Sequence, residues 1–247
     1  KIMNGKLVYN KEFNRDIFIY LPPSYNCGKK YPVIYVHDGD SFADILEELM
    51  SFAEELESEN YSEHIIVGIT PIDRLDEYTP WPAAPLVEKF KAFGGKGEEY
   101  LSFIVNELKP YIDRTYNTCE NNAGIMGFSL GGLISLFAMY KHACFDKVVS
   151  ICGSQWYEGW IDFIKSNEII NKDINILLIS GLKEADGKKT IQKNAVTSVE
   201  KGYEIFKSNV NDESNVSLEW DEYGHHNNRM ERYKKAILYF YTGNHRI

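Results

Sequence analysis

Residues 123–134 read Ala-Gly-Ile-Met-Gly-Phe-Ser-Leu-Gly-Gly-Leu-Ile, and this stretch decides the predicted fold. The apolar run Ala123 to Met126 is typical of a short buried strand, whereas the small and apolar residues after Ser129 are typical of a helix. A G-x-S-x-G pattern alone arises by chance in about one chain in ten of this size. The strand, sharp turn and helix around the pattern therefore carry the prediction.

The turn predicts a reactive serine. Glycines two positions before and after Ser129 let the backbone bend tightly, so that the hydroxyl would project above the sheet. The N–H of Leu130, free at the helix start, would face a developing oxyanion. A serine hydroxyl is a poor nucleophile without a base, so a histidine must follow in the chain.

Two of the histidines after Ser129 fit that role. His142 lies about four turns along the helix that follows Ser129, which is too far, and His245 lies in the C-terminal tail. The pair His225 and His226 follows a predicted strand and precedes a predicted helix. From the residues alone, either member of the pair could be the base.

A carboxylate should orient that histidine, and in the chain order of such enzymes it lies between the serine and the histidine. The apolar run Ile174 to Ile179 ends in a loop that contains Glu184, our choice, and Asp186, the reserve. The loop after an earlier strand should supply a second oxyanion donor. There the flexible Gly39 would let the N–H of Asp40 or its neighbour face the reacting carbonyl.

Short β-branched runs alternate with stretches of helical period along the chain. This alternation predicts an α/β fold, a mostly parallel central sheet with helices on both faces. The predicted strands are Ile17 to Tyr20, Val33 to His37, Ile65 to Ile69, Ala123 to Met126, Lys147 to Ile151, Ile174 to Ile179 and Val216 to Glu222. The predicted helices are Phe42 to Leu56, Glu98 to Ile112, Leu130 to His142, Thr190 to Ser208 and Asn228 to Tyr241. Within the second helix, Pro110 should cause a late kink or end.

Two stretches fit neither element and could bind substrate. The first, Pro71 to Gly95, is rich in proline and contains Trp81, so we expect a long loop that walls a substrate pocket. In the same loop Arg74 could pair with an acidic substrate group, or belong to a surface ion network. The second contains Trp156, for which core packing and substrate contact are equally good interpretations.

Composition limits the class of protein. The chain has 247 residues, 44% of them apolar, which is enough for one sizeable domain spanning residues 1–247. A net charge of -9 and the lack of a basic run argue against a nucleic-acid partner. No apolar run approaches the roughly 20 residues that span a bilayer, so we expect no membrane partner. The oligomeric state is not predicted.

Cysteine usage and the start of the chain bear on location. Four cysteines without C-x-x-C spacing favour reduced thiols in a cytoplasmic enzyme. The first residues, Lys1 to Gly5, contain no apolar segment typical of a secretory signal. A secreted mature form that has lost its signal is the alternative.

Several further motifs resemble one family. The chain is similar to the "putative esterase" family related to esterase D, which includes siderophore trilactone esterases, feruloyl and acetyl esterases, and mycolyltransferases. The motifs are R-x-I-x-I-Y-L-P-P-S-Y over Arg15 to Tyr25, Y-V-H-D-G-D-S-F over Tyr35 to Phe42, R-x-x-E-Y-T-P over Arg74 to Pro80, E-L-K-P-Y-I-D-R-T-Y over Glu107 to Tyr116, the turn over Gly124 to Gly132, and G-S-Q-W over Gly153 to Trp156.

The resemblance implies an α/β-hydrolase fold and the hydrolysis of a small-molecule ester, of modest acyl or lactone type, without metal or organic cofactor. It implies Ser129 as nucleophile and Glu184 as acid. The family's G-x-H-N-E pattern aligns with residues 224–228, which makes His226 the base. Asn228 stands where the family has glutamate, a departure that bears on the substrate. The substrate contacts we expect are Gly39, Arg74, Trp81 and Trp156.

Three other functions compete with ester hydrolysis. Acyl transfer would use the same serine, histidine and carboxylate, with an alcohol in place of water in the second step. A metal-dependent phosphoesterase could use His37-Asp38-Gly39-Asp40 with Gly224-His225-His226 as ligands, but leaves the serine turn unexplained. A non-catalytic binding module on the same fold would not need all three catalytic residue types.

Overall fold

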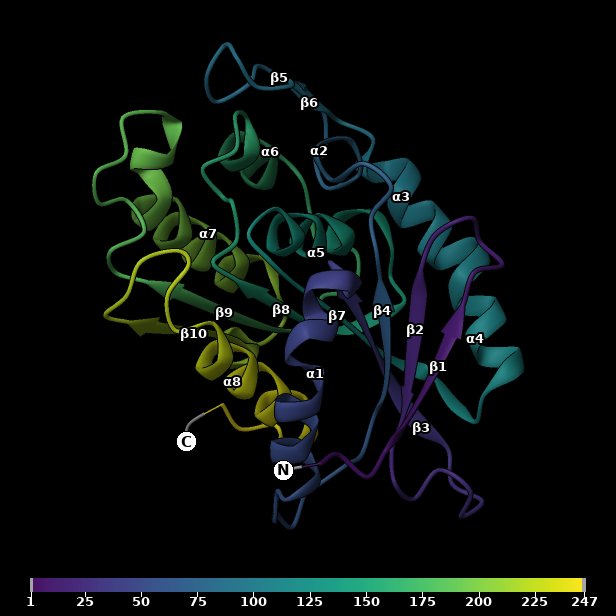
Figure 1. Cartoon of the computed structure of the whole chain (residues 1–247). Helices are drawn as coiled ribbons and strands as arrows, with labels where there is room; N and C mark the ends of the chain where they lie inside the picture. Colours follow the sequence, from purple (N-terminus) through teal and green to yellow (C-terminus); the bar gives the residue numbers. More distant parts are fainter. Residues whose placement is uncertain (1, 246–247) are drawn as a thin grey trace.

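A computed structural model describes residues 2–245 and is built around one eight-stranded sheet (Figure 1). The strand order is β1-β2-β4-β3-β7-β8-β9-β10; β1, β2 and β4 pair antiparallel, and all other neighbours are parallel. The mostly parallel sheet confirms the predicted fold class. The strands are β1 (Lys6–Asn10), β2 (Ile17–Leu21), β3 (Tyr31–His37), β4 (Ile65–Ile69), β7 (Thr118–Phe128), β8 (Phe145–Ile151), β9 (Asn175–Gly181) and β10 (Val216–Asp221).

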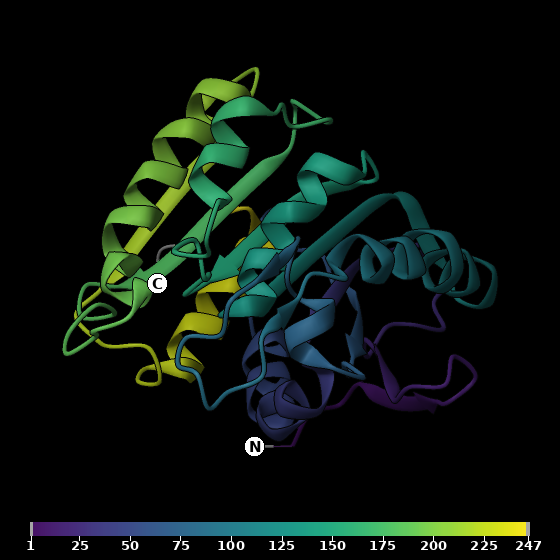
Figure 2. The same ribbon diagram turned by 90° about the horizontal axis from the view of Figure 1, so that it is seen from above.

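Helices cover both faces of the sheet, as seen from above in Figure 2. Alternate side chains of a strand point to opposite faces, so Val33 and Tyr35 of β3 join one apolar core while Ile34 and Val36 join the other. The second core contains α1 and α8, and the first contains the remaining long helices. The helices are α1 (Gly39–Glu54), α2 (Arg74–Glu77), α3 (Gly97–Phe103), α4 (Lys109–Thr115), α5 (Leu130–Lys141), α6 (Trp160–Ser166), α7 (Ala195–Asn209) and α8 (Arg229–Thr242).

The register brings the loops after β3, β7, β8, β9 and β10 to one edge of the sheet. His37 at the end of β3 aligns with Ile69, and Phe128 at the end of β7 aligns with Ile151. Asp221 at the end of β10 aligns with Gly181. In an open parallel sheet ligands bind outside the carboxyl ends of the strands, so this edge is where a site is expected.

The helical segment predicted over Glu98 to Ile112 does not end at Pro110. It continues through a π-helical turn, η1 (Ile104–Leu108), into α4, which ends at Thr115. In this turn the N–H of Lys109 bonds to Ile104, five residues back. The wider turn accommodates the proline ring, which clashes with a carbonyl in a regular helix.

Other element bounds also differ from prediction. Strand β1 is an edge strand, half exposed, that its mixed sequence did not reveal. Helix α1 begins at Gly39, three residues before the predicted start at Phe42. The proline-rich stretch 71–95 is mainly loop, as expected, apart from α2 and a two-residue pairing of β5 (Pro82–Ala83) with β6 (Phe93–Gly94). Short 3-10 turns, η2 (Ile191–Asn194) and η3 (Glu213–Asn215), precede α7 and β10. Within residues 2–245, no helix has the length and apolar character needed to cross a bilayer.

Candidate active site

Ser129 lies in the sharp turn between β7 and α5, with a backbone conformation of φ 62° and ψ -120°. Such a conformation is strained for a residue with a side chain and persists only where the surroundings hold it. Here the N–H of Ser129 bonds to the carbonyl of Ile151 at 2.9 Å, and its own carbonyl accepts from Leu133 at 3.1 Å and Ser154 at 3.1 Å. The turn is therefore fixed from three sides.

The glycines of the turn are required by close packing. A Cβ on Gly127 would lie 2.5 Å from the backbone of Gly131, and one on Gly132 would lie 2.6 Å from the hydroxyl of Ser150. Since the Gly131 contact is with backbone atoms, no side-chain movement could relieve it. This agrees with the steric reason given for the glycines of the motif.

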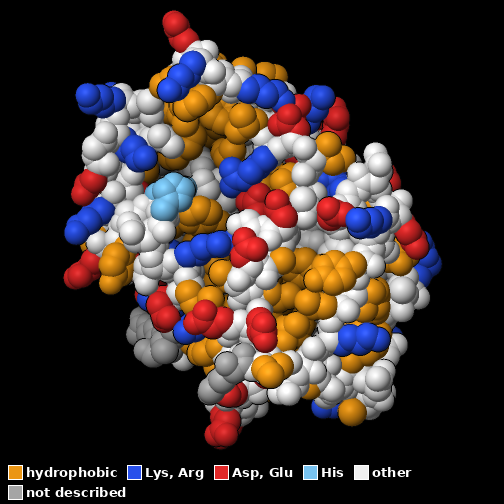
Figure 3. Space-filling view, viewed as in Figure 1, with side chains coloured by type: hydrophobic (Ala, Val, Ile, Leu, Met, Phe, Trp, Pro, Cys, Tyr) orange, Lys and Arg blue, Asp and Glu red, His pale blue; other side chains and the backbone are white. Residues whose placement is uncertain are grey.

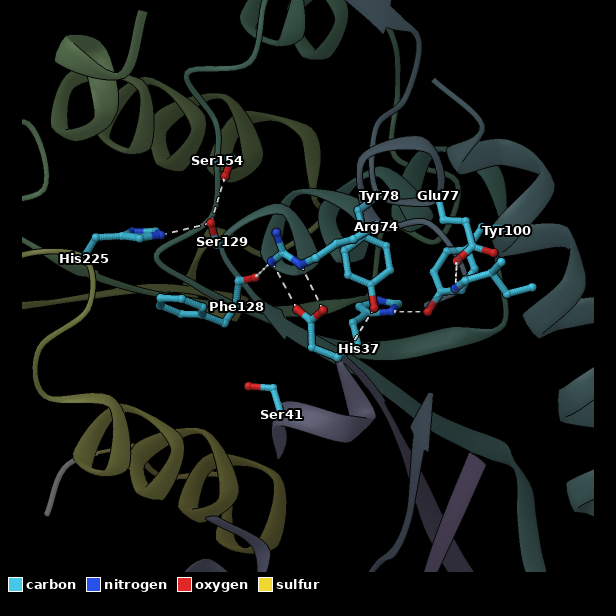
Figure 4. Close-up of polar contacts among 12 residues, drawn as sticks. His37, Ser41, Arg74, Glu77, Tyr78, Tyr100, Phe128, Ser129, Ser154 and His225 are labelled. Carbon is cyan, nitrogen blue, oxygen red and sulfur yellow. Dashed lines mark hydrogen bonds and ion pairs between the residues drawn. The ribbon is translucent and has the colours of Figure 1, made fainter. Parts of the chain in front are cut away.

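The histidine that meets Ser129 is His225 (Figure 4). Its Nε2 lies 2.9 Å from the Ser129 Oγ, and its Nδ1 lies 2.8 Å from an oxygen of Glu184. The expectation that His226 takes this position is wrong. The ring of His226 packs edge-on against that of His225 at 4.8 Å, with an interplanar angle of 82°. The two histidines are adjacent and chemically identical, so the loop conformation alone decided which of them reaches the serine.

The carboxylate that the structure brings to His225 is Glu184, in the turn after β9; Asp186 is exposed. The Glu184 side chain is 6% exposed. Burial acts to raise the pKa of Glu184, but hydrogen bonding and charge from His225, the Cys152 thiol and Arg232 outweigh it and lower the pKa. The group is thus held as a carboxylate, the form that accepts the Nδ1–H of a neutral imidazole.

Arg232 of α8 fixes the loop that carries His225, and the sequence analysis missed it. Its guanidinium donates to the carbonyls of His225 at 3.1 Å and Gly224 at 2.9 Å, and makes a bidentate pair with Asp221 at 2.6 and 2.8 Å. The side chain is 1% exposed. One signal was available: Arg232 shares a buried stripe with Ala236 and Phe240 at intervals of four, where a charged residue needs buried partners.

Arg74 also lies at the site, although not in a surface network with its sequence neighbours. It forms a bidentate pair with Asp38, at 2.9 and 3.1 Å, and donates to the carbonyl of Phe128 at 3.2 Å (Figure 4). Its side chain is 34% exposed, so part of the guanidinium still faces solvent. Arg74 thus contacts the residue before Ser129, and its contact with substrate stays a prediction.

A buried group of polar rings lies behind this ion pair. The Tyr78 hydroxyl accepts from the N–H of Asp38 at 2.7 Å, and the Tyr100 hydroxyl lies 2.7 Å from Nδ1 of His37. Burial, together with the charge of Arg74, lowers the pKa of His37 to about 3. His37 therefore stays neutral at neutral pH and serves as packing for the turn.

The two expected oxyanion donors lie at helix starts. Leu130 is the first residue of α5, and Asp40 is in the first turn of α1. Contrary to our expectation, the turn does not depend on a flexible Gly39. The residue in the left-handed conformation is Asp38, with φ 54°. Gly39 is buried, and a Cβ added to it would lie 2.6 Å from the backbone of Gly68. Gly39 is thus required for close packing of the start of α1 against β4.

The two tryptophans pack into one aromatic wall. Trp81 donates its Nε1–H to the carbonyl of Glu158 at 2.7 Å, and its own carbonyl accepts from the Tyr157 hydroxyl. Trp156 is almost buried and packs on Phe93, with ring centroids 6.4 Å apart. Core packing therefore accounts for most of Trp156. Trp81 is part of the loop predicted to wall the pocket, and Trp156 packs against Phe93 of that loop.

One side-chain cluster in the described chain could hold a metal: Cys152, Glu184 and His225, whose ligand atoms all lie within 4.8 Å of one another. The cluster that a two-metal phosphoesterase would need does not form within residues 2–245. His37 is fully buried, and it is not part of this group. The spacing of the four cysteines gave no indication of this cluster.

The chain is similar to known proteins along most of its length. Residues 11–234 match the family described as "Putative esterase". The chain belongs to this family. It is an ester hydrolase with an α/β-hydrolase fold, as the sequence resemblance implied.

Named relatives come from Bacillus subtilis (strain 168). "Uncharacterized protein YbbA" is 35% identical over 248 residues, with 98% of each chain covered. "Ferri-bacillibactin esterase BesA" is 29% identical over 207 residues, covering 75% of this chain and 71% of the relative. Among solved structures, the BES protein from Bacillus cereus has a TM-score of 0.71 at 20% identity, with 98% and 97% covered. An IroE-like serine hydrolase from Shewanella oneidensis has a TM-score of 0.75 at 18% identity, with 94% and 78% covered. These structures support the fold.

Proposed function

We propose that this esterase cleaves its substrate through an acyl-enzyme on Ser129, with His225 as general base and Glu184 as the orienting acid. The observation that carries the proposal is an unbroken chain of two hydrogen bonds, in which Nδ1–H of His225 donates to Glu184 and the Ser129 hydroxyl donates to Nε2. Because Glu184 accepts the Nδ1–H, Nε2 presents its lone pair to the serine hydroxyl.

In the first step Oγ attacks the ester carbonyl while Nε2 takes its proton. The imidazolium then gives this proton to the leaving alkoxide, and the acyl group stays on Ser129. In the second step the freed Nε2 takes a proton from water, which attacks the acyl carbon. The imidazolium then gives this proton to the Ser129 Oγ as the acyl–oxygen bond breaks and the acid leaves. Glu184 stabilises the positive ring in both steps.

The developing oxyanion is stabilised by backbone donors. We assign one to the N–H of Leu130 and the other to the N–H of Asp40. Both are in first helical turns, where N–H groups have no partner within the helix and the helix dipole favours negative charge. The N–H of Asp38 is already taken by the Tyr78 hydroxyl, so the donor must come from later in this turn.

For the substrate we propose an ester or lactone of modest size, with a siderophore lactone as the first to test. The relative BesA is a ferri-bacillibactin esterase, and two proteins of similar fold, EstA and EstB from Aspergillus nidulans, are siderophore hydrolases. Figure 3 shows one face of the molecule, on which apolar side chains lie among both basic and acidic ones.

The test combines a fluorophosphonate label with point variants. Wild type should take one label and hydrolyse p-nitrophenyl esters, whereas Ser129→Ala should take none and keep only the roughly 10³–10⁴-fold rate over water that binding and oxyanion donors supply. His225→Ala should be nearly as inactive, and its matched control His226→Ala should stay active. Equal labelling of wild type and Ser129→Ala would refute the mechanism.

The substrate and the second step need separate measurements. A panel of short-chain, feruloyl, acetylated-sugar and trilactone esters, compared by kcat/KM, would identify the preferred acyl group. Adding an acceptor alcohol and analysing products separates hydrolysis from acyl transfer: we expect the free acid, and a new ester as main product would make the enzyme a transferase.

A further inference from the structure

Cys152 is a buried thiol for which the proposed mechanism has no use. It follows the last residue of β8, is 1% exposed, and its N–H bonds to the carbonyl of Ile179 at 2.7 Å. Its backbone has φ 48°, an uncommon conformation for a residue with a side chain. The loop thus holds the thiol where Sγ, a carboxylate oxygen of Glu184 and Nδ1 of His225 lie within 4.8 Å of one another.

Glu184 offers this cluster an unused ligand atom. One of its oxygens, Oε2, bonds to His225 at 2.8 Å. The other, Oε1, is buried and accepts no hydrogen bond from an N–H or O–H group within residues 2–245, while the thiol of Cys152 donates to this carboxylate. A thiol is a weak donor, so it compensates the buried negative charge poorly, and a cation bound between the thiolate and the carboxylate would compensate it better.

We propose that Cys152, Glu184 and His225 form a binding site for Zn²⁺, and that the bound ion switches the esterase off. The switching half of this proposal rests on the proposed function. Thiolate, imidazole and carboxylate are the ligand types of zinc sites, where three protein ligands and one water make a tetrahedral set. Bond lengths of about 2.0–2.3 Å place ligand atoms roughly 3.3–3.8 Å apart. The present cluster reaches this geometry if the thiol moves in and the imidazole and carboxylate separate slightly.

The proton count explains the inhibition. Before binding, the neutral imidazole of His225 carries its proton on Nδ1. Zn²⁺ takes the Nδ1 lone pair, so the single ring proton must move to Nε2 by exchange with solvent, and the Cys152 thiol releases one proton. Nε2 then donates to Ser129 instead of accepting, and no base is left. The charges of Zn²⁺, thiolate and carboxylate cancel, which limits the cost of burial.

The first readout is binding, which does not depend on turnover. Chelator-treated protein is titrated with Co²⁺, a spectroscopic substitute for Zn²⁺, and the thiolate-to-cobalt charge-transfer absorption is followed. Wild type and Ser129→Ala should both develop this band, Zn²⁺ should displace it, and Cys152→Ala and Cys152→Ser should lack it. The proposal is overturned if wild type shows no band, or if the Cys152 variants show the same one.

The second readout is inhibition of p-nitrophenyl ester hydrolysis by Zn²⁺ in a non-chelating buffer, reversed by EDTA. Each variant is compared with its own metal-free rate, and circular dichroism checks its fold. Because Cys152→Ala lacks the thiolate, the Zn²⁺ concentration that halves its activity should be at least about 10-fold higher than for wild type. The control His226→Ala should be inhibited at the same Zn²⁺ concentration as wild type. Equal inhibition of Cys152→Ala and wild type would refute the switch. A cobalt band in a protein that hydrolyses no ester would instead refute the proposed function and leave the site standing.

Discussion

Replacing Arg232 by methionine tests whether the hydrogen bond from Arg232 to the backbone carbonyl of His225 positions the catalytic base. The substitution keeps most of the side-chain volume but removes the donors to His225 and Gly224 and the bidentate pair with Asp221. We expect the folded protein to be less stable and, beyond this, to be a poorer catalyst.

The loss of stability follows from the ion pair. Breaking a buried pair by removing one partner costs about 3–5 kcal/mol, because the remaining charge is left uncompensated. The Asp221 side chain is 12% exposed and keeps hydrogen bonds from the N–H of Tyr223 at 3.0 Å and from Asn228 at 3.2 Å. We therefore expect the lower end, about 3 kcal/mol, by urea unfolding.

The loss of activity follows from the carbonyl contacts. Without them the loop can move His225 relative to Ser129, and a displacement of about 1 Å can cost about 100-fold in rate. Since the substrate does not contact Arg232, whose side chain is 1% exposed, the effect should fall on kcat with little change in KM. Arg232→Lys keeps the positive charge but lacks the planar guanidinium that donates to several acceptors at once, so its kcat should lie between those of wild type and Arg232→Met.

A double variant separates the two effects. Asp221→Asn combined with Arg232→Met no longer leaves an unpaired carboxylate, so it should regain much of the stability while kcat stays low. The reasoning is refuted if the double variant regains kcat together with stability, because positioning would then be only a matter of folding. It is equally refuted if Arg232→Met loses stability but keeps the wild-type kcat.

Three further changes have defined outcomes. Glu184→Gln should lower kcat by about 10²–10⁴-fold while the exposed control Asp186→Asn changes it by no more than about twofold; the opposite ranking would reassign the acid. Burial lowers the pKa of His64 to about 3, below its ordinary value of 6.5, so the unfolded chain binds a proton that the folded one does not. Stability should therefore fall as pH drops below about 6.5, by about 2 kcal/mol from this residue between pH 7 and 5, and urea unfolding of His64→Asn at both pH values should show a correspondingly smaller drop. Gly127→Ala places a Cβ 2.5 Å from the backbone of Gly131 and should cost about 1–3 kcal/mol and most esterase activity; wild-type kinetics in this variant would contradict the packing argument.

Some features of the fold and of the site follow from local sequence. Buried parallel strands must be apolar on both faces, and turns that pack backbone against backbone must contain glycine. The runs at β3, β4, β7, β8 and β9 and the glycines around Ser129 were therefore readable without coordinates. The same reasoning fails where a local rule allows two outcomes. Pro110 could either end the helix or be accommodated within it, and the π-helical turn that precedes Pro110 accommodates it.

Local sequence patterns were enough to predict the fold class, the serine in its turn, and the two loops that would bring a carboxylate and a histidine to it. Tertiary structure alone decided that His225 and not His226 faces Ser129, that Arg232 secures its carbonyl, and that Cys152 lies beside Glu184. The reason is physical. Periodicity and turn chemistry depend on neighbours along the chain, whereas these contacts depend on how the loops after β7, β8, β9 and β10 and the helix α8 are placed against one another at one edge of the sheet.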